Sequence, residues 1–360
     1  MMTFWKDNWD ETRGRFRGWW RRTGLLVSTW GEPPRGAPHI AVDDPGRPRN
    51  NTQRWADAPW RARAERHALA YQDFPLEKLP LADTTLGPGS LSLMLGAQPE
   101  FAETTVWFRR RADDAALWAP LAFDRANRWW KLHRDILEEN LRASRGQYLV
   151  PCPDLVENLD VLASLRGTQQ LMIDLLVEPA WVQEQLWRIN DVFFEVYEEV
   201  YSLIRAADGG SSFYAFSLWA PGKMAKVQAD ASALISPGQF EEFVLPPLAQ
   251  QCQWLDFSLF HVDGTQCLRH LDFLLGLEKL DAVEFTPEPG QPSGGSPRWY
   301  ELYRKILAAG KSVQAVDVRP EEVAPLLHEI GTQGVYLIVN FTQSSMPLAE
   351  FQALVRSFRG

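Results

Sequence analysis

Cysteine is scarce in this chain of 360 residues, which has only Cys152, Cys252 and Cys267. Their odd number and wide spacing exclude a disulfide framework and the zinc sites that are built on C-x-x-C pairs. Long apolar runs are also missing, since no stretch approaches the roughly 18 consecutive apolar residues of a membrane span. The N-terminus lacks the apolar segment of a secretory signal. These absences predict a reduced protein that lies in the cytoplasm and not in a membrane.

Basic residues are fewer than acidic ones, and glycine-rich phosphate-binding loops are missing as well. The formal net charge is -9, which argues against nucleic acid as a partner. No glycine-rich loop follows any strand that we predict, and this disfavours a dinucleotide-binding domain. Hydrophobic residues make up 45% of the chain and charged residues 23%, as is typical of a soluble globular protein with a large core.

Strand and helix patterns alternate four times in the C-terminal half. We predict strands over 254–264, 280–286, 311–318 and 335–341, and helices over 267–277, 296–310, 319–331 and 347–358. The strand segments are almost continuously apolar. We therefore expect parallel strands that are buried on both faces, in a doubly wound sheet or a closed barrel.

The earlier part of the chain is predicted to be mostly helical. A long helical pattern covers 178–207, a strand and the loop after it cover 211–221, and a helix lies within 235–255. The first 75 residues are rich in Arg, Trp and Pro and contain one predicted strand over 25–29. We expect this segment to wrap around the outside of the main domain.

Two titratable side chains lie at the end of the first of the four predicted strands. In "FSLFHVDG", residues 257–264, His261 and Asp263 point the same way because strand side chains alternate. Glu284 ends the next strand, so the three side chains converge if these strands are neighbours. One imidazole and two carboxylates can bind Zn²⁺, Mn²⁺ or Fe²⁺, and without a metal they can do acid–base work. A purely structural polar cluster is the alternative.

Several stretches carry a family resemblance. They are "LGPGSLSLMLGAQPEF" at 86–101, "LRGTQQLMIDLLVEPAWVQEQL" at 165–186, "ISPGQFEEFVLPPLAQQ" from 235, "HVDG" from 261, "HLDFLLGLEKLDAVEFTPEPG" from 270 and "PRWYELYRKILAAGK" from 297. Over residues 75–358 the chain resembles the uroporphyrinogen decarboxylase-like superfamily, which includes methyltransferases that act on corrinoid proteins. The resemblance implies an α/β fold, a (β/α)8 TIM barrel over 75–360 behind an N-terminal extension over 1–74, with the site at the carboxyl ends of the strands.

The metal ligands of this superfamily are matched in part. Its corrinoid methyltransferases hold zinc on a His-x-Cys pair and a later Cys, whereas this chain has His261 and Asp263, and "VYLIVNFTQSS" from residue 335 contains no cysteine. A distant relative, cobalamin-independent methionine synthase, adds a glutamate about one βα unit after its first pair, and Glu284 matches that place. The resemblance therefore implies that His261, Asp263 and Glu284 are metal ligands or catalytic residues.

Other residues are candidates for substrate binding. Gln228 and Asp230, in "KVQADASALISP", occupy the region where relatives place substrate contacts. Asp317 ends a predicted strand and could reach the site. Trp219 and Tyr214 belong to the segment 211–221 and could form an aromatic wall.

Three functions stay open at this point. The resemblance favours methyl transfer or demethylation of a small-molecule substrate, with a corrinoid protein as partner and Zn²⁺ or another divalent metal as cofactor. The second hypothesis is decarboxylation of a tetrapyrrole-like or other carboxylated substrate held by Arg13, Arg17 or Arg21, with Asp83 nearest to the catalytic aspartate of the decarboxylases. The third is a non-catalytic barrel that binds a small molecule at an aromatic-lined mouth.

Overall fold

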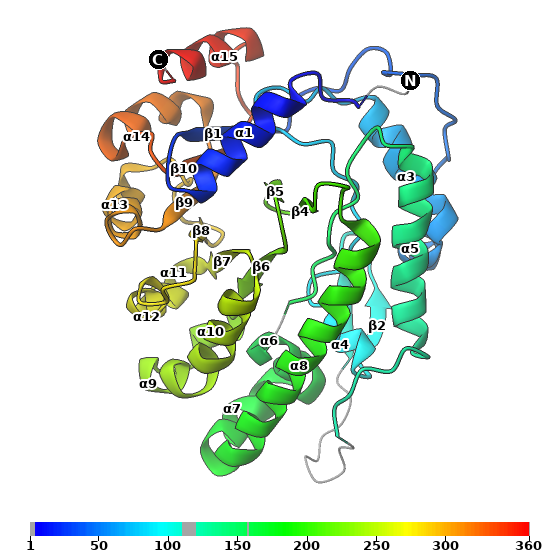
Figure 1. Cartoon of the computed structure of the whole chain (residues 1–360), viewed down its shortest axis with the longest axis vertical. Helices are drawn as coiled ribbons and strands as arrows, with labels where there is room; N and C mark the ends of the chain where they lie inside the picture. Colours follow the sequence, from blue (N-terminus) through cyan, green and yellow to red (C-terminus); the bar gives the residue numbers. More distant parts are fainter. Residues whose placement is uncertain (1–3, 110–119, 157, 360) are drawn as a thin grey trace.

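The computed structural model describes residues 4–109, 120–156 and 158–359. Its largest sheet has six parallel strands in the order β1-β10-β9-β8-β7-β6 (Figure 1). These strands are β1 (Leu25–Trp30), β6 (Met224–Gln228), β7 (Phe257–Asp263), β8 (Ala282–Thr286), β9 (Ser312–Val318) and β10 (Val335–Asn340). Two antiparallel hairpins are β2 (Gln98–Phe101) with β3 (Val106–Arg109), and β4 (Ser211–Phe213) with β5 (Leu218–Ala220).

Helices follow the strands of the second half, as the sequence predicts. They are α11 (Gly264–Cys267), α12 (Leu271–Leu275), α13 (Tyr300–Ala308), α14 (Val323–Ile330) and α15 (Leu348–Ser357). The four predicted strands are confirmed with slightly shorter bounds. The predicted helix 267–277 is divided, because a 3-10 turn at Leu268–His270 separates α11 from α12.

The remaining helices come from the first two thirds of the chain. They are α1 (Trp9–Trp20), α2 (Asn51–Ala56), α3 (Ala58–Ala70), α4 (Leu91–Met94), α5 (Arg128–Ser144), α6 (Asn158–Arg166), α7 (Thr168–Val177), α8 (Pro179–Ile204), α9 (Pro237–Gln239) and α10 (Leu245–Trp254). Within the described ranges, none of these helices combines the length and the apolar character that crossing a membrane requires.

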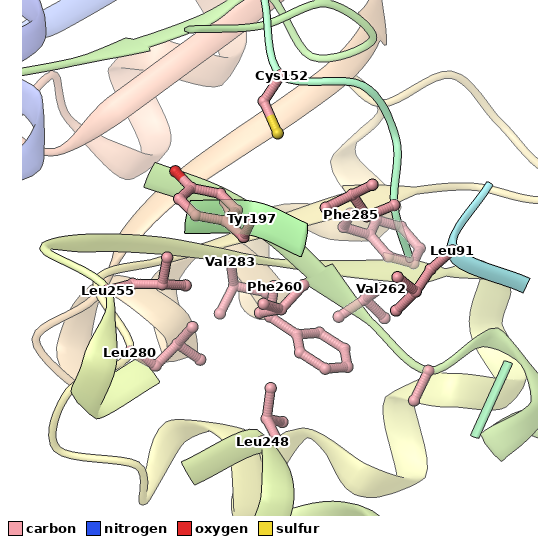
Figure 2. Packing of buried hydrophobic residues seen from close by; sticks show 14 of the residues in the cluster. Leu91, Cys152, Tyr197, Leu248, Leu255, Phe260, Val262, Leu280, Val283 and Phe285 are labelled. Carbon is pink, nitrogen blue, oxygen red and sulfur yellow. The ribbon is translucent and has the colours of Figure 1, made fainter. Parts of the chain in front are cut away.

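A buried apolar layer separates the sheet from the helices that cover it. Figure 2 shows Phe260 of β7 and Val283 of β8 in this layer together with Leu248 of α10. Side chains alternate along a strand, so His261 and Glu284, the next residues on these strands, point to the opposite, inner face. The inner face is therefore where the polar residues of β7 and β8 meet.

The six-stranded ladder does not close on itself among the described residues, since β6 and β1 are its two edges. Isolated backbone contacts cross the space between these edges. They are Glu77 N to Val27 O at 3.0 Å and the parallel bridges Leu81–Leu149 and Cys152–Phe213. The fold is thus a mixed, barrel-like α/β fold, and the closed eight-stranded barrel stays a prediction.

The β4–β5 hairpin reaches into the inner face of the sheet. Gln314 of β9 donates its side-chain amide to the carbonyl of Phe216 at 2.8 Å, and the Tyr336 hydroxyl donates to the carbonyl of Ser217 at 2.8 Å. The residues 214–217 therefore form a hairpin tip that is held by inward-facing side chains of β9 and β10. The sequence predicted one strand and a loop here, because three-residue strands are too short to show a pattern.

Helix α1 covers the end of the sheet where the strands begin. Trp19 donates its indole N–H to the carbonyl of Gly334 at 3.2 Å, and Ser312 donates its hydroxyl to the carbonyl of Trp19 at 2.6 Å. Gly334 directly precedes β10, and Ser312 is the first residue of β9. The predicted extension 1–74 thus supplies a helix at this end and also contributes β1, which pairs with β10 along its whole length.

Candidate functional site

A row of polar side chains crosses four adjacent strands at one level. Gln228 of β6 stands beside His261 of β7, His261 beside Glu284 of β8, and Glu284 beside Gln314 of β9. All four lie on the inner face, near the carboxyl ends of β6, β7 and β8. The sequence predicted the convergence of His261 and Glu284, and the parallel register of their strands accounts for it.

One group of side chains in the described part of the chain could hold a metal ion. It consists of Asp230, His261 and Asp263, whose donor atoms lie within 4.8 Å of one another. Asp263 is exposed at the end of β7, and Asp230 follows β6. We call these three residues the donor cluster. Glu284, which the sequence suggested as a third ligand, does not belong to it, and Asp230, which it suggested as a substrate contact, does.

Glu284 instead contacts the other side of the imidazole. One of its carboxylate oxygens meets Nδ1 of His261, and the other accepts the hydroxyl of Thr286 at 2.7 Å. Burial lowers the pKa of His261, but the charge and hydrogen bond of Glu284 and the charge of Asp230 outweigh it, so this pKa lies above its ordinary value. Glu284 is fully buried, and its contact with Nδ1 leaves Nε2 as the ring nitrogen available to a ligand.

Asp230 is held in place by a second aspartate that the sequence analysis missed. Asp160 of α6 accepts the backbone N–H groups of Asp230 and Ala231, each at 2.8 Å. The side chain of Gln228 donates to Asp230 at 2.8 Å. Burial, followed by the charge of Asp160, raises the pKa of Asp230 to about 7, against the opposing charges of His261 and Lys226.

Lys226 is a further site residue that sequence reasoning missed. It is buried on β6, where it forms an ion pair with Asp154 at 2.8 Å and also contacts Gln228. A signal was present, because a lysine two residues before Gln228 shares its face of the strand and interrupts an apolar run. Asp154 and Asp160 lie in segments whose sequence gives no comparable signal.

The donor cluster has the chemistry of a divalent cation site. Its donors are one imidazole nitrogen and carboxylate oxygens, a set that suits Zn²⁺, Mn²⁺ or Fe²⁺. The Oδ1 atom of Asp230 is buried and has no hydrogen-bond partner in the described structure. A buried acceptor is normally satisfied, and a cation between Asp230 and His261 would satisfy this one. The residues present therefore fit a metal ion.

A cavity of about 770 Å³ lies on the other side of the hairpin tip. It is bounded by the ends of β1, β9 and β10 and by the tip residues, with Tyr214 and Asp317 in its wall. Phe216 also lines it, and the Phe216 ring lies 4.9 Å from the His261 ring between centroids. Phe216 thus separates the cavity from the donor cluster by the thickness of one side chain.

Asp317 has an unusual backbone at the cavity wall. Its φ is 54°, in the left-handed region that non-glycine residues rarely adopt. The register between β9 and β10 shifts at this place, between Leu337 and Val339, and the Asn340 side chain donates to Asp317 at 2.8 Å. Such local strain concentrates at functional sites, and ligand binding by Asp317 stays a prediction.

Trp219 and the three arginines lie away from the cavity. Trp219 is 2% exposed and packs against Phe16 of α1, with 6.3 Å between ring centroids. Arg13 pairs with Asp208 at 2.8 Å, Arg17 lies over Trp219, and none of Arg13, Arg17 and Arg21 is among the described residues that line the cavity. These three arginines are therefore not placed to hold a substrate carboxylate in this cavity.

Asp83 also lies outside the donor cluster. Its carboxylate accepts the backbone N–H and the hydroxyl of Thr85 at 2.9 and 2.8 Å, and its own N–H donates to Glu65 at 2.9 Å. Burial and the charge of Asp83 raise the pKa of Glu65 to about 7. Asp83 is thus a neighbour of the cavity residue Glu65.

The Glu65→Gln variant is expected to change how stability depends on pH. Because the folded-state pKa is raised above the ordinary 4.5, the stabilising contribution is present below pH 4.5 and is lost as pH rises to about 7. Removing the ionisable group should therefore make the variant gain about 1–3 kcal/mol relative to wild type between pH 5 and pH 8. Urea unfolding at both pH values measures this, with Glu100→Gln on β2 as an exposed control. Equal differences at the two pH values would contradict the prediction.

Comparison with solved structures finds a similar fold in a methyltransferase from Methanosarcina mazei. The two chains share 11% sequence identity with a TM-score of 0.59, over 96% of this chain and 98% of that chain. At this identity the similarity concerns the fold alone. No family model and no curated protein matches the chain.

Proposed function

We propose that this protein is a methyltransferase or demethylase whose donor cluster binds a divalent metal ion. The single observation that carries the proposal is the convergence of Asp230, His261 and Asp263 within 4.8 Å, on the inner face of a fold shared with a methyltransferase. The family resemblance of the sequence supports the same reaction and a corrinoid protein as partner. We also propose that residues 79–82 and 149–152 complete an eight-stranded barrel.

Each residue around the cluster has a separate task in this proposal. His261 would offer Nε2 to the metal, and Glu284 accepts a hydrogen bond from the Nδ1–H group and so fixes the ring orientation. Asp160 holds the loop that carries Asp230. A divalent cation bound there would supply Lewis acidity, which favours the deprotonated form of a thiol, an alcohol or water. Phe216 keeps the imidazole shielded from solvent on the cavity side.

Methyl transfer between cobalamin and a thiol tests this function directly. The methyl group of methylcobalamin moves to a thiolate, such as that of 2-mercaptoethanol, and the electron pair of the broken bond stays on cobalt. Under anaerobic conditions the Zn²⁺- or Mn²⁺-loaded protein should accelerate the loss of methylcobalamin, measured by absorbance. Asp230→Asn should slow this by at least about tenfold, because it removes one charged ligand.

The matched control is Asp208→Asn, which removes an aspartate that pairs with Arg13. It should leave the rate unchanged. If the metal-loaded wild type gives no rate above buffer with a series of small thiols, methyl transfer from cobalamin is not its reaction.

A further inference from the structure

The cavity beside the donor cluster has a strongly unequal charge balance. Among the described residues that line it, the charged ones are Glu32, Glu65, Asp73, Asp317 and, as the single basic residue, Lys78. Lys78 pairs with Glu32 at 2.9 Å, and Arg35 pairs with Asp73. Among the described residues, the carboxylate of Asp317 accepts a hydrogen bond from a neutral amide, that of Asn340. Because the pKa of Glu65 is raised to about 7, Asp317 is the lining carboxylate that keeps a negative charge without an ion pair among the described residues, a condition that favours a cationic ligand.

One buried acceptor in the cavity wall has no partner. The Glu32 side chain is 9% exposed, and its Oε1 atom makes no hydrogen bond while the other oxygen pairs with Lys78. Because buried polar atoms are rarely left unsatisfied, this atom marks a place where a ligand supplies positive charge or a donor.

Aromatic side chains complete the lining. They are Trp30, Tyr71, Tyr214 and Phe216. Trp30 is 47% exposed and Tyr214 is 42% exposed, although both are large and apolar. The faces of aromatic rings attract organic cations, and they do so more strongly once water is excluded. Exposed rings next to unpaired carboxylate oxygens are therefore suited to an alkylammonium group.

We infer that this cavity binds a small alkylammonium cation, at a site separate from the donor cluster. Phe216 stands between this ligand and His261.

Calorimetric titration of the metal-depleted protein with choline tests the binding. The comparison ligand is 3,3-dimethylbutan-1-ol, which has the shape of choline without its charge. Choline should bind at least about tenfold more tightly, because only the cation gains from the carboxylates and the ring faces. Equal affinity for the two ligands, or no binding of choline, would overturn the inference.

Two variants locate the site. Glu32→Gln should weaken choline binding by about tenfold or more, since it removes a carboxylate and leaves Lys78 unpaired. Tyr214→Leu should weaken it by about three- to tenfold through loss of the ring face. The control Glu100→Gln removes the same charge on β2 and should change nothing, so an equal loss in Glu32→Gln and Glu100→Gln also overturns the inference.

The His261→Ala variant separates this inference from the proposed function. It removes a member of the donor cluster but no residue that lines the cavity, so it should keep the choline affinity of the wild type. Failure of methyl transfer in the metal-loaded wild-type protein, together with intact choline binding, would refute the proposed function and leave the cation site standing.

Discussion

Replacing His261 with alanine should lower the affinity for Zn²⁺ or Mn²⁺ by about 100-fold or more, because it removes the single nitrogen ligand of the donor cluster. Glu284→Gln should lower it by about 10- to 100-fold, since residues that orient a ligating histidine typically contribute that much. Titration calorimetry against a competing chelator measures both. The relative size of the two effects distinguishes two roles for Glu284. The sequence suggests that Glu284 is a metal ligand, whereas in the structure Glu284 contacts Nδ1 of His261 and would orient the ring.

Matched controls separate this effect from a general loss of charge or of histidine. His328→Ala changes an exposed histidine on α14, and Asp317→Asn changes a carboxylate of the cavity wall. Neither should alter metal affinity. A wild-type protein that binds neither ion, or a His261→Ala variant that binds as well as His328→Ala, would remove the basis for a metal site.

Trp219→Ala is expected to destabilise the protein by about 3–5 kcal/mol, the usual range for truncating a large buried aromatic side chain. The Trp219 ring contacts Trp9 and Phe16 of α1, with centroids 5.6 and 6.3 Å apart. The carbonyl of Trp219 also accepts the indole N–H of Trp20 at 2.9 Å. Urea unfolding at constant pH gives the change in free energy.

The control for this variant is Trp107→Ala on β3. Trp107 is 64% exposed, so its loss should cost less than about 0.5 kcal/mol. From the sequence, Trp219 is a candidate for an aromatic wall of the substrate site. Should Trp219→Ala keep wild-type stability and lose affinity for choline, Trp219 would be a wall residue and not a packing residue.

The donor cluster could be predicted from the sequence only in part. His261 and Asp263 could be predicted to share a face because the alternation along a strand is local. Glu284 could be predicted to join them only if the two strands are neighbours, and the structure pairs His261 with Glu284. Asp230 could be singled out, but not its role. Its position depends on hydrogen bonds to Asp160, which lies 70 residues earlier in the chain.

The same limit applies to the aromatic residues. Tyr214 and Trp219 lie five positions apart in one hairpin, and their sequence context gives both the same prediction. The hairpin has a tight turn between them, so that Tyr214 lines the cavity whereas Trp219 packs in the core against α1. Which end of the sheet each ring reaches is decided by the anchoring of the hairpin tip on Gln314 and Tyr336.

By itself, the sequence determined the alternation of strands and helices in the second half, the parallel arrangement of those strands, and the common direction of His261 and Asp263. These follow from periodicity and burial, which are local properties. Only the tertiary structure decided which third residue joins the donor cluster, where the cavity lies and which charges surround it. Those features arise from contacts between segments far apart in the chain, and such contacts leave no periodic trace in the sequence.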